Sequence, residues 1–237
     1  MDIKKIKAKA KKKLSGNYVV IIVALIIYGL IEGLFTGTSK LIYNDNMNIL
    51  FNIIVMGLLY EGLLSISIKI AKGKNADIMD LFKKTDLFWK TAAVTIILTA
   101  FTALCSAMIF VAGNSLNVFL SYQTDISTGL SSFMILVGIL LLVAIIAFYI
   151  VMMIYFSQVY FVLYDNEKMP VFSIFERSMD LVEFHKFNYF IYKLSFIGWA
   201  ILGIFTFGLL YLWLIPYIMV SDVNFYDELK RIEKSEK

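Results

Sequence analysis

The chain has 237 residues, of which 60% are hydrophobic and 17% are charged, and its formal net charge is +4. Soluble domains average roughly 45–50% apolar and about 25% charged residues, so this composition excludes an ordinary soluble globular protein and favours a membrane protein. The single cysteine, Cys105, excludes an intrachain disulfide and a cysteine-based metal site.

Residues 1–16 predict a basic amphipathic N-terminal helix. Ile3, Ile6, Ala10 and Leu14 fall on one helical face, and seven lysines occupy the rest. This pattern is typical of a helix that lies on an anionic membrane surface, so anionic lipids are an expected partner. The alternative is that the lysines only orient the chain in the membrane and recognise no particular lipid.

The remainder, residues 17–237, is predicted to form a single all-α membrane domain, a polytopic bundle of transmembrane helices. The first apolar run is long and lacks a small-x-small cleavage pattern, so we expect a retained span rather than a signal peptide. Because a spanning helix needs about 20 mostly apolar residues, we predict six spans, near residues 17–35, 48–70, 88–112, 130–163, 184–203 and 208–225.

The last two predicted spans come from one apolar block, residues 187–220, whose only charge is Lys193. The loop before the block and the tail after it are both basic, so the chain should enter and leave on one side. A hairpin that turns at Gly203–Gly208 satisfies this, because glycine permits a tight reversal. Both termini are then cytoplasmic, in the inner membrane. The alternative is one long kinked helix with the C-terminal tail outside.

Two shorter segments, residues 77–85 and 170–178, are expected to form interfacial amphipathic helices before the third and fifth spans. Pro170 suits the first turn of such a helix. The fourth apolar run, residues 130–163, would be roughly 50 Å long as one helix. It should therefore tilt or continue past the headgroups.

Charges at membrane depth are functional candidates, and Glu61 is the best placed. It recurs with Gly57, Ser65 and Lys69 every four residues, so these four share a helix face that should meet other protein. One interpretation is an ion or proton relay, or a polar cavity for a substrate. The other is a packing seam in which Glu61 is protonated or hydrogen-bonded and Lys69 lies at the cytoplasmic interface.

Gly29, Gly33 and Gly37 also repeat every four residues in the first span. Such a seam lets another helix backbone approach closely. It predicts helix packing, either within the chain or with a second copy or another membrane protein.

His185 is the only histidine, which makes a zinc site very unfavourable. The sequence contains no nucleotide-binding loop, nucleophile elbow or metalloprotease motif. We therefore expect no catalytic residues, no metal and no cofactor. Nucleic-acid binding has only the basic tail in its favour, and the membrane explains that tail better.

The C-terminal third carries the most specific pattern. A segment that begins Leu194-Ser-Phe-Ile-Gly-Trp199 continues through Pro216-Tyr217 to Asn224-Phe-Tyr226. In this pattern the chain resembles the bacterial integral-membrane family catalogued as domain of unknown function 975. The residues that carry the resemblance are Ser178, Ser195, Gly198, Trp199, Gly208, Pro216, Tyr217, Phe225 and Tyr226. The stretch Leu181–Lys186 departs from the family pattern because it lacks a glycine.

The resemblance implies a multispan fold and supplies no catalytic residues. It extends distantly to the membrane domain attached to some glycerophosphodiester phosphodiesterases, which hints at lipids or envelope maintenance. We expect a non-enzymatic membrane protein that acts as an envelope scaffold, a lipid-organising factor or an accessory subunit. Two alternatives stay open: a small transporter or channel component with Glu61 in a polar path, and immunity-type protection against membrane-active peptides.

Overall fold

The computed structural model describes residues 1–42, 55, 57–82, 87–121 and 128–236. These residues form helices and turns with no strand among them, which confirms the all-α prediction. In chain order the α-helices are α1 (Ile3–Leu14), α2 (Tyr18–Ile42), α4 (Gly57–Ala71), α5 (Phe88–Ser121), α6 (Thr128–Tyr155), α7 (Val159–Asp165), α8 (Val171–Glu183), α9 (Lys186–Leu194), α10 (Ile197–Phe205) and α11 (Tyr211–Glu236). Short 3-10 helices are η2 (Ile78–Leu81) and η4 (Phe156–Gln158).

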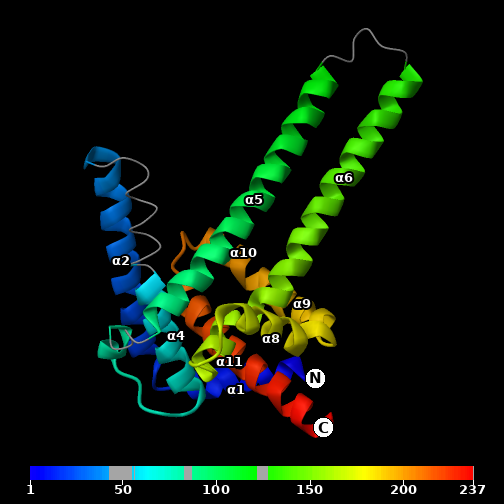
Figure 1. Cartoon of the computed structure of the whole chain (residues 1–237). Helices are drawn as coiled ribbons and strands as arrows, with labels where there is room; N and C mark the ends of the chain where they lie inside the picture. Colours follow the sequence, from blue (N-terminus) through cyan, green and yellow to red (C-terminus); the bar gives the residue numbers. More distant parts are fainter. Residues whose placement is uncertain (43–54, 56, 83–86, 122–127, 237) are drawn as a thin grey trace.

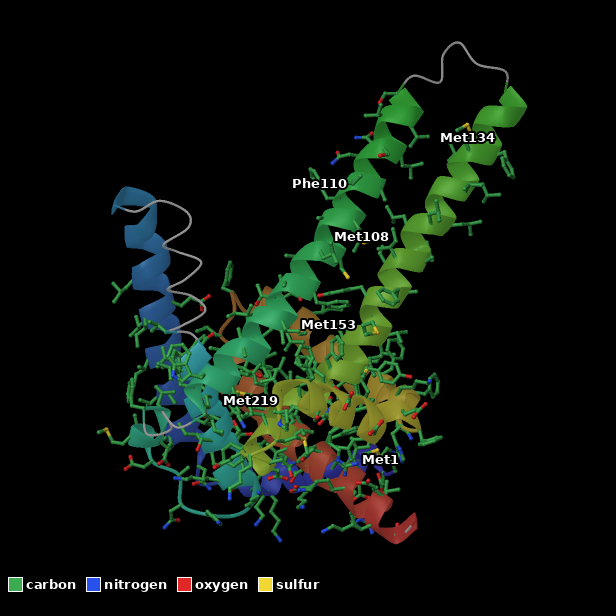
Figure 2. The ribbon with its side chains drawn as sticks, viewed as in Figure 1. Met1, Met108, Phe110, Met134, Met153 and Met219 are labelled. Carbon is green, nitrogen blue, oxygen red and sulfur yellow. The ribbon has the colours of Figure 1, made fainter. Side chains whose placement is uncertain are left out.

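The helices α5 and α6 form a long hairpin that extends away from the packed base of the molecule (Figure 1). They contact each other along their length, but most of their apolar side chains face outward. Figure 2 shows Met108, Phe110 and Met134 high on the hairpin, where Phe110 is 72% exposed. Large exposed apolar surfaces are rare on soluble monomers, so this hairpin is built for contact with lipid.

Three helical stretches of the described chain are long and apolar enough to cross a membrane. They are Phe88–Val118, Phe133–Asp165 and Lys186–Phe205. A fourth crossing is present if Ile3–Leu14 and Tyr18–Leu34, which meet at 89°, are taken as one broken span. The structure thus supports a multispan membrane protein, with three to four candidate crossings in the described part of the chain against the six expected from sequence.

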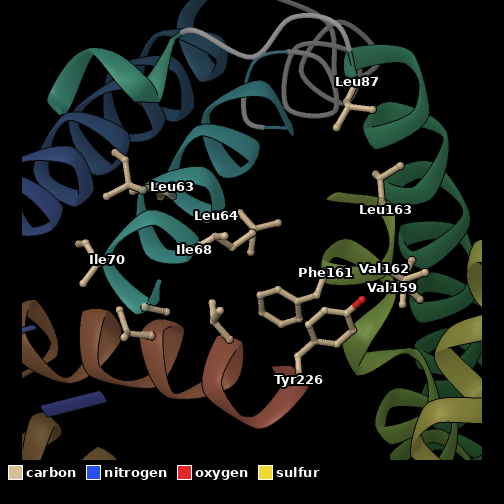
Figure 3. Packing of buried hydrophobic residues seen from close by; sticks show 14 of the residues in the cluster. Leu63, Leu64, Ile68, Ile70, Leu87, Val159, Phe161, Val162, Leu163 and Tyr226 are labelled. Atoms are coloured by element: carbon tan, nitrogen blue, oxygen red, sulfur yellow. The ribbon is translucent and has the colours of Figure 1, made fainter. Parts of the chain in front are cut away.

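The core lies at the base, where α4 is the central helix. Twelve of its fifteen residues are buried. Figure 3 shows Leu64 and Ile68 of α4 on the side of Phe161 of α7 and Tyr226 of α11, whereas Leu63 points the other way. The rings of Phe161 and Tyr226 stack with centroids 5.6 Å apart. Because each fully buried large apolar side chain contributes about 1.5–3 kcal/mol, α4 is a principal source of the fold's stability.

The role of α4 differs from the expected second span, residues 48–70. Residues 48–54 and 56 lie outside the described residues, and the described remainder is a 15-residue helix enclosed by protein rather than lipid. A helix covered by lipid and a helix covered by other helices have similarly apolar sequences, so the sequence alone does not distinguish them. The neighbouring elements α2, α11 and η2 supply the cover of α4 here.

The fourth apolar run is not a single straight helix. The α-helix α6 ends at Tyr155, the 3-10 turn η4 follows, and α7 then continues to Asp165. The side chain of Ser178 on α8 bonds to the freed carbonyl of Tyr155 at 2.7 Å. The break lets α7 enter the core while α6 remains in the exposed hairpin.

A tight turn joins α10 to α11 at the glycines predicted for it. Gly208 has φ +86°, and its N–H donates to the carbonyl of Gly203 at 3.0 Å. A Cβ on Gly203 would lie only 2.7 Å from Cζ of Tyr211, so glycine makes room for this ring. The hydroxyl of Tyr211 donates to the carbonyl of Ala200 at 2.8 Å. The helix boundaries differ from those predicted, because α9 and α10 are separate and α11 runs to Glu236.

The N-terminal helix expected over residues 1–16 corresponds to α1, Ile3–Leu14. Asp2 begins it, accepting a 3.1 Å hydrogen bond from the N–H of Lys5. Such caps typically stabilise a helix by about 1 kcal/mol. In Figure 1, α1 lies across the base of the molecule, and α2 leaves it nearly at a right angle.

Candidate functional site

The polar stripe of α4 lies inside the protein. Glu61 and Ser65 are each 3% exposed, and Gly57 is buried as well. Lys69, at the far end of the same face, forms a 2.7 Å ion pair with Asp80. The structure therefore brings the four residues onto one face that meets other parts of the chain.

The carboxylate of Glu61 contacts α5. Thr91 donates from its hydroxyl to Oε2 of Glu61 at 3.1 Å. A small cavity adjoins this carboxylate and is lined also by Tyr160 and Leu163. The space open to the centre of a water molecule inside it is about 10 Å³. One water needs about that much space. The geometry therefore suits a hydrogen-bonded carboxyl with room for one water, and it is too small for an organic substrate.

The Lys69–Asp80 pair fixes a short loop against α4. Asp77 and Asp80 form a reciprocal cap around η2, in which Asp80 accepts from the N–H of Asp77 at 2.9 Å. A Cβ on Gly62 would lie 2.1 Å from the carbonyl oxygen of Leu81. Gly62 is thus the residue that lets η2 approach the helix. Sequence reasoning missed it, although a glycine beside a buried glutamate was the available signal.

The predicted glycine seam of α2 has a different environment. A Cβ built on Gly29 or Gly33 would have no heavy atom within 4 Å in the described part of the chain, and Gly29 is exposed. Gly37 lies in α2 where only the backbone is described. Packing of this seam against a second copy or another membrane protein stays a prediction.

The apolar face of α1 packs on protein. Ile6, Ala10 and Leu14 are buried against α11 and α4. The exposed lysines are Lys4, Lys5, Lys9, Lys11 and Lys12. The face that sequence reasoning assigned to lipid is therefore closed, and the lysine face is the one that remains free.

A second polar cluster joins α9 to α11. Lys193 lies 2.8 Å from both carboxylate oxygens of Asp222, and the hydroxyl of Tyr192 donates to the same carboxylate at 2.8 Å. Sequence reasoning noted Lys193 only as the single charge of the last apolar block and did not identify Asp222. Lys193 and Asp222 are 29 residues apart in sequence, so no local sequence pattern predicts their ion pair.

The residues of the C-terminal signature serve packing and turns. Ser195 accepts from the ammonium group of Lys7 at 3.0 Å. Phe225 is fully buried with Tyr192, and Tyr226 lies in the core beside Phe161. Pro216 is buried inside α11, and Tyr217 meets the ring of Phe196 edge-on. By contrast, Trp199 is 53% exposed and Gly198 has open space around it.

Within the described residues, no group of three or more His, Cys, Asp or Glu side chains has the arrangement of a metal site. A family model described as "Protein of unknown function (DUF975)" matches residues 1–233. Among curated proteins and among solved structures, none matches the chain.

Proposed function

Since the chain belongs to the DUF975 family, whose function is unknown, we propose that it is a non-enzymatic, lipid-organising protein of the cytoplasmic membrane. In this proposal the lysine face of α1 gathers anionic lipids around a helical bundle. The observation that carries the proposal is the position of α1. Its apolar face is closed by α11 and α4, and five of its seven lysines are exposed.

The geometry of α1 and α2 supports this role. The two helices meet at 89°, so a membrane-crossing α2 holds α1 parallel to the membrane plane. At that depth each lysine near an anionic surface contributes about 1 kcal/mol of attraction. A rigid row of lysines, held by burial of Ile6, Ala10 and Leu14, therefore concentrates anionic headgroups without folding on the membrane.

The termini support a cytoplasmic placement of this face. The N- and C-termini lie near each other at the base of the molecule (Figure 1), and both tails are rich in lysine. Positively charged segments beside spans stay in the cytoplasm. We therefore assign both termini, and the lysine face of α1, to the cytoplasmic side of the inner membrane.

The test compares lipids retained by the full-length chain after extraction into a neutral detergent. The triple variant Lys4→Gln, Lys9→Gln, Lys12→Gln should retain several-fold less phosphatidylglycerol per chain than the wild type. The matched control Lys74→Gln, Lys168→Gln, Lys234→Gln removes the same charge from exposed positions on other elements. Equal losses in both variants would show that only net charge matters and would contradict the proposal.

A second candidate, a small transporter or channel component, is favoured by the buried carboxyl of Glu61 beside Thr91. Intramembrane carboxyls commonly relay protons. Proton flux into liposomes that contain the wild-type chain, compared with Glu61→Gln, tests this role. Absence of flux that depends on Glu61 in a folded protein rules it out.

A further inference from the structure

A cavity of about 290 Å³ opens between the N-terminal helix and the last two helices. Its volume lies near the lower limit of the roughly 300–1,000 Å³ typical of small-molecule sites. The side chains that give it its chemistry are Lys7, Lys11, Tyr18, Trp199, Trp213 and Tyr217. They come from α1, the start of α2, α10 and α11, so the site exists only when the two ends of the chain pack together.

Lys7 and Lys11 supply the charge of the cavity. They are one helical turn apart, so their ammonium groups lie on the same face of α1. In the described part of the chain neither forms an ion pair with a carboxylate. Lys7 is partly buried, donates to Ser195 at 3.0 and 3.3 Å, and lies 4.0 Å from the ring centroid of Phe196.

Among the described residues, the ammonium group of Lys7 therefore has no anionic partner and one N–H donor without an acceptor. An ammonium group has three N–H donors, and Ser195 accounts for two of them. Burial lowers the pKa of Lys7, which is the mark of a cation removed from water without a compensating negative charge. A phosphate between Lys7 and Lys11 would supply that charge.

The rest of the cavity lining is aromatic and apolar. Two of the chain's three tryptophans, Trp199 and Trp213, belong to it, and each is about half exposed. Leu210 and the buried Leu214 complete this lining. Tryptophan and tyrosine are enriched where headgroups meet acyl chains. The cavity thus offers both cations from α1 and interfacial aromatic surface from α10 and α11.

We propose that this cavity binds one anionic phospholipid, with its phosphate between Lys7 and Lys11 and the start of its acyl chains against Trp199 and Trp213. The inference deepens the proposed lipid-organising function and rests on it. It adds a single stoichiometric site to the diffuse attraction of the exposed lysines. Leu202, three residues after Trp199 and also exposed, lies on the same side of α10 and extends the surface against which the acyl chains lie.

The test uses the full-length chain in a neutral maltoside detergent, in a Trp89→Phe background that leaves Trp199 and Trp213 as the only fluorophores of their kind. Short-chain phosphatidylglycerol is titrated at about 0.5 M salt, where the screening length is only about 4 Å and diffuse attraction is weak. We expect saturable binding of one lipid per chain. The variant Lys7→Gln, Lys11→Gln should bind about 10-fold more weakly or worse, since two phosphate contacts are lost.

The matched control is Lys74→Gln, Lys168→Gln, which removes the same charge from exposed positions on other elements and should bind like the parent. Lys11→Gln alone disturbs no described hydrogen bond and should bind several-fold more weakly, which keeps the test valid if the double variant is unstable. Equal weakening in the Lys74/Lys168 control would overturn the site, whereas the proposed function is judged separately by the phosphatidylglycerol that the Lys4/Lys9/Lys12 variant retains.

Two further probes identify the ligand. Phosphatidylcholine of the same chain length should bind more weakly, and equal binding would overturn the role of the lysine charges. Inorganic phosphate and glycerol phosphate should compete poorly because they lack acyl chains. Competition at affinities equal to that of the lipid would show that the cavity takes a soluble anion, which would overturn the lipid assignment.

Discussion

Lys193 lies 2.8 Å from both carboxylate oxygens of Asp222 and thereby fastens α9 to α11. The carboxylate is 17% exposed and also accepts from Tyr192, so removal of Lys193 leaves a partly desolvated charge with one donor fewer. Bonds of this kind to charged groups are worth about 1.5–3 kcal/mol.

We predict that Lys193→Met lowers the free energy of unfolding by about 1.5 kcal/mol, at the lower end of that range because Lys193 is more than a third exposed. Unfolding in mixed detergent and SDS measures the change. Lys168→Met, which removes an exposed lysine, is the control. The double variant Lys193→Met, Asp222→Leu should lose less than the sum of the single changes, because no charge is left unpaired. Additive losses would contradict the pairing.

Gly62→Ala should strongly destabilise the base of the molecule. The added Cβ would meet the carbonyl oxygen of Leu81 at 2.1 Å and its carbonyl carbon at 2.6 Å, and a backbone cannot rotate away as a side chain can. Overpacking of this kind costs about 1–3 kcal/mol. The matched change Gly29→Ala meets open space and should be neutral, or stabilising by up to about 1 kcal/mol through helix propensity. Equal behaviour of the two variants in thermal unfolding would refute the close approach.

Replacement of Glu61 should distinguish hydrogen bonding from charge. Glu61→Gln keeps an acceptor for Thr91 and should change stability by less than about 1 kcal/mol. Glu61→Leu leaves the hydroxyl of Thr91, a residue that is only 2% exposed, without that acceptor and should cost about 1–3 kcal/mol. If Glu61→Gln were as damaging as Glu61→Leu, the negative charge itself would be required.

The stability of α11 should depend on the ionisation of Asp227. Burial raises the pKa of this carboxyl despite the nearby Lys230, Lys72 and Lys9. A raised pKa means that the contribution of Asp227 is fully present below its unfolded pKa and is lost as pH rises through its folded pKa. Asp227→Asn should therefore raise the melting temperature at pH 7 and change it less at pH 4. A larger gain at pH 4 would reverse the sign and contradict the assignment.

Sequence patterns predicted the parts of the fold that depend on local chemistry. The spacing of Ile6, Ala10 and Leu14 predicted one apolar face on α1, although it assigned that face to lipid rather than to α11 and α4. The glycines at 203 and 208 predicted the turn before α11. Both follow from a periodicity or a backbone requirement that a few adjacent residues express completely.

What covers each helix could not be predicted in the same way. The apolar residues of α4 are buried in protein and those of α5 face outward, yet both helices are similarly apolar in sequence. The partners Asp222 for Lys193 and Leu81 for Gly62 come from elements distant in the chain. The cavity around Lys7 and Trp199 was missed for this reason, since its walls are brought together only by tertiary packing.

The packing of α1 on α11 also means that the base of the molecule can fold completely only at the end of synthesis. The ribosome delivers Ile6, Ala10 and Leu14 first and their partners Leu214, Val220 and Phe225 last. Until the final helix emerges, α4 covers only part of this apolar face, and the rest must be sheltered by the bilayer surface or a chaperone. A chain that stops before Tyr211 would form the α5–α6 hairpin but would lack α11, which covers α1 and α4. Quality-control proteases should therefore remove it.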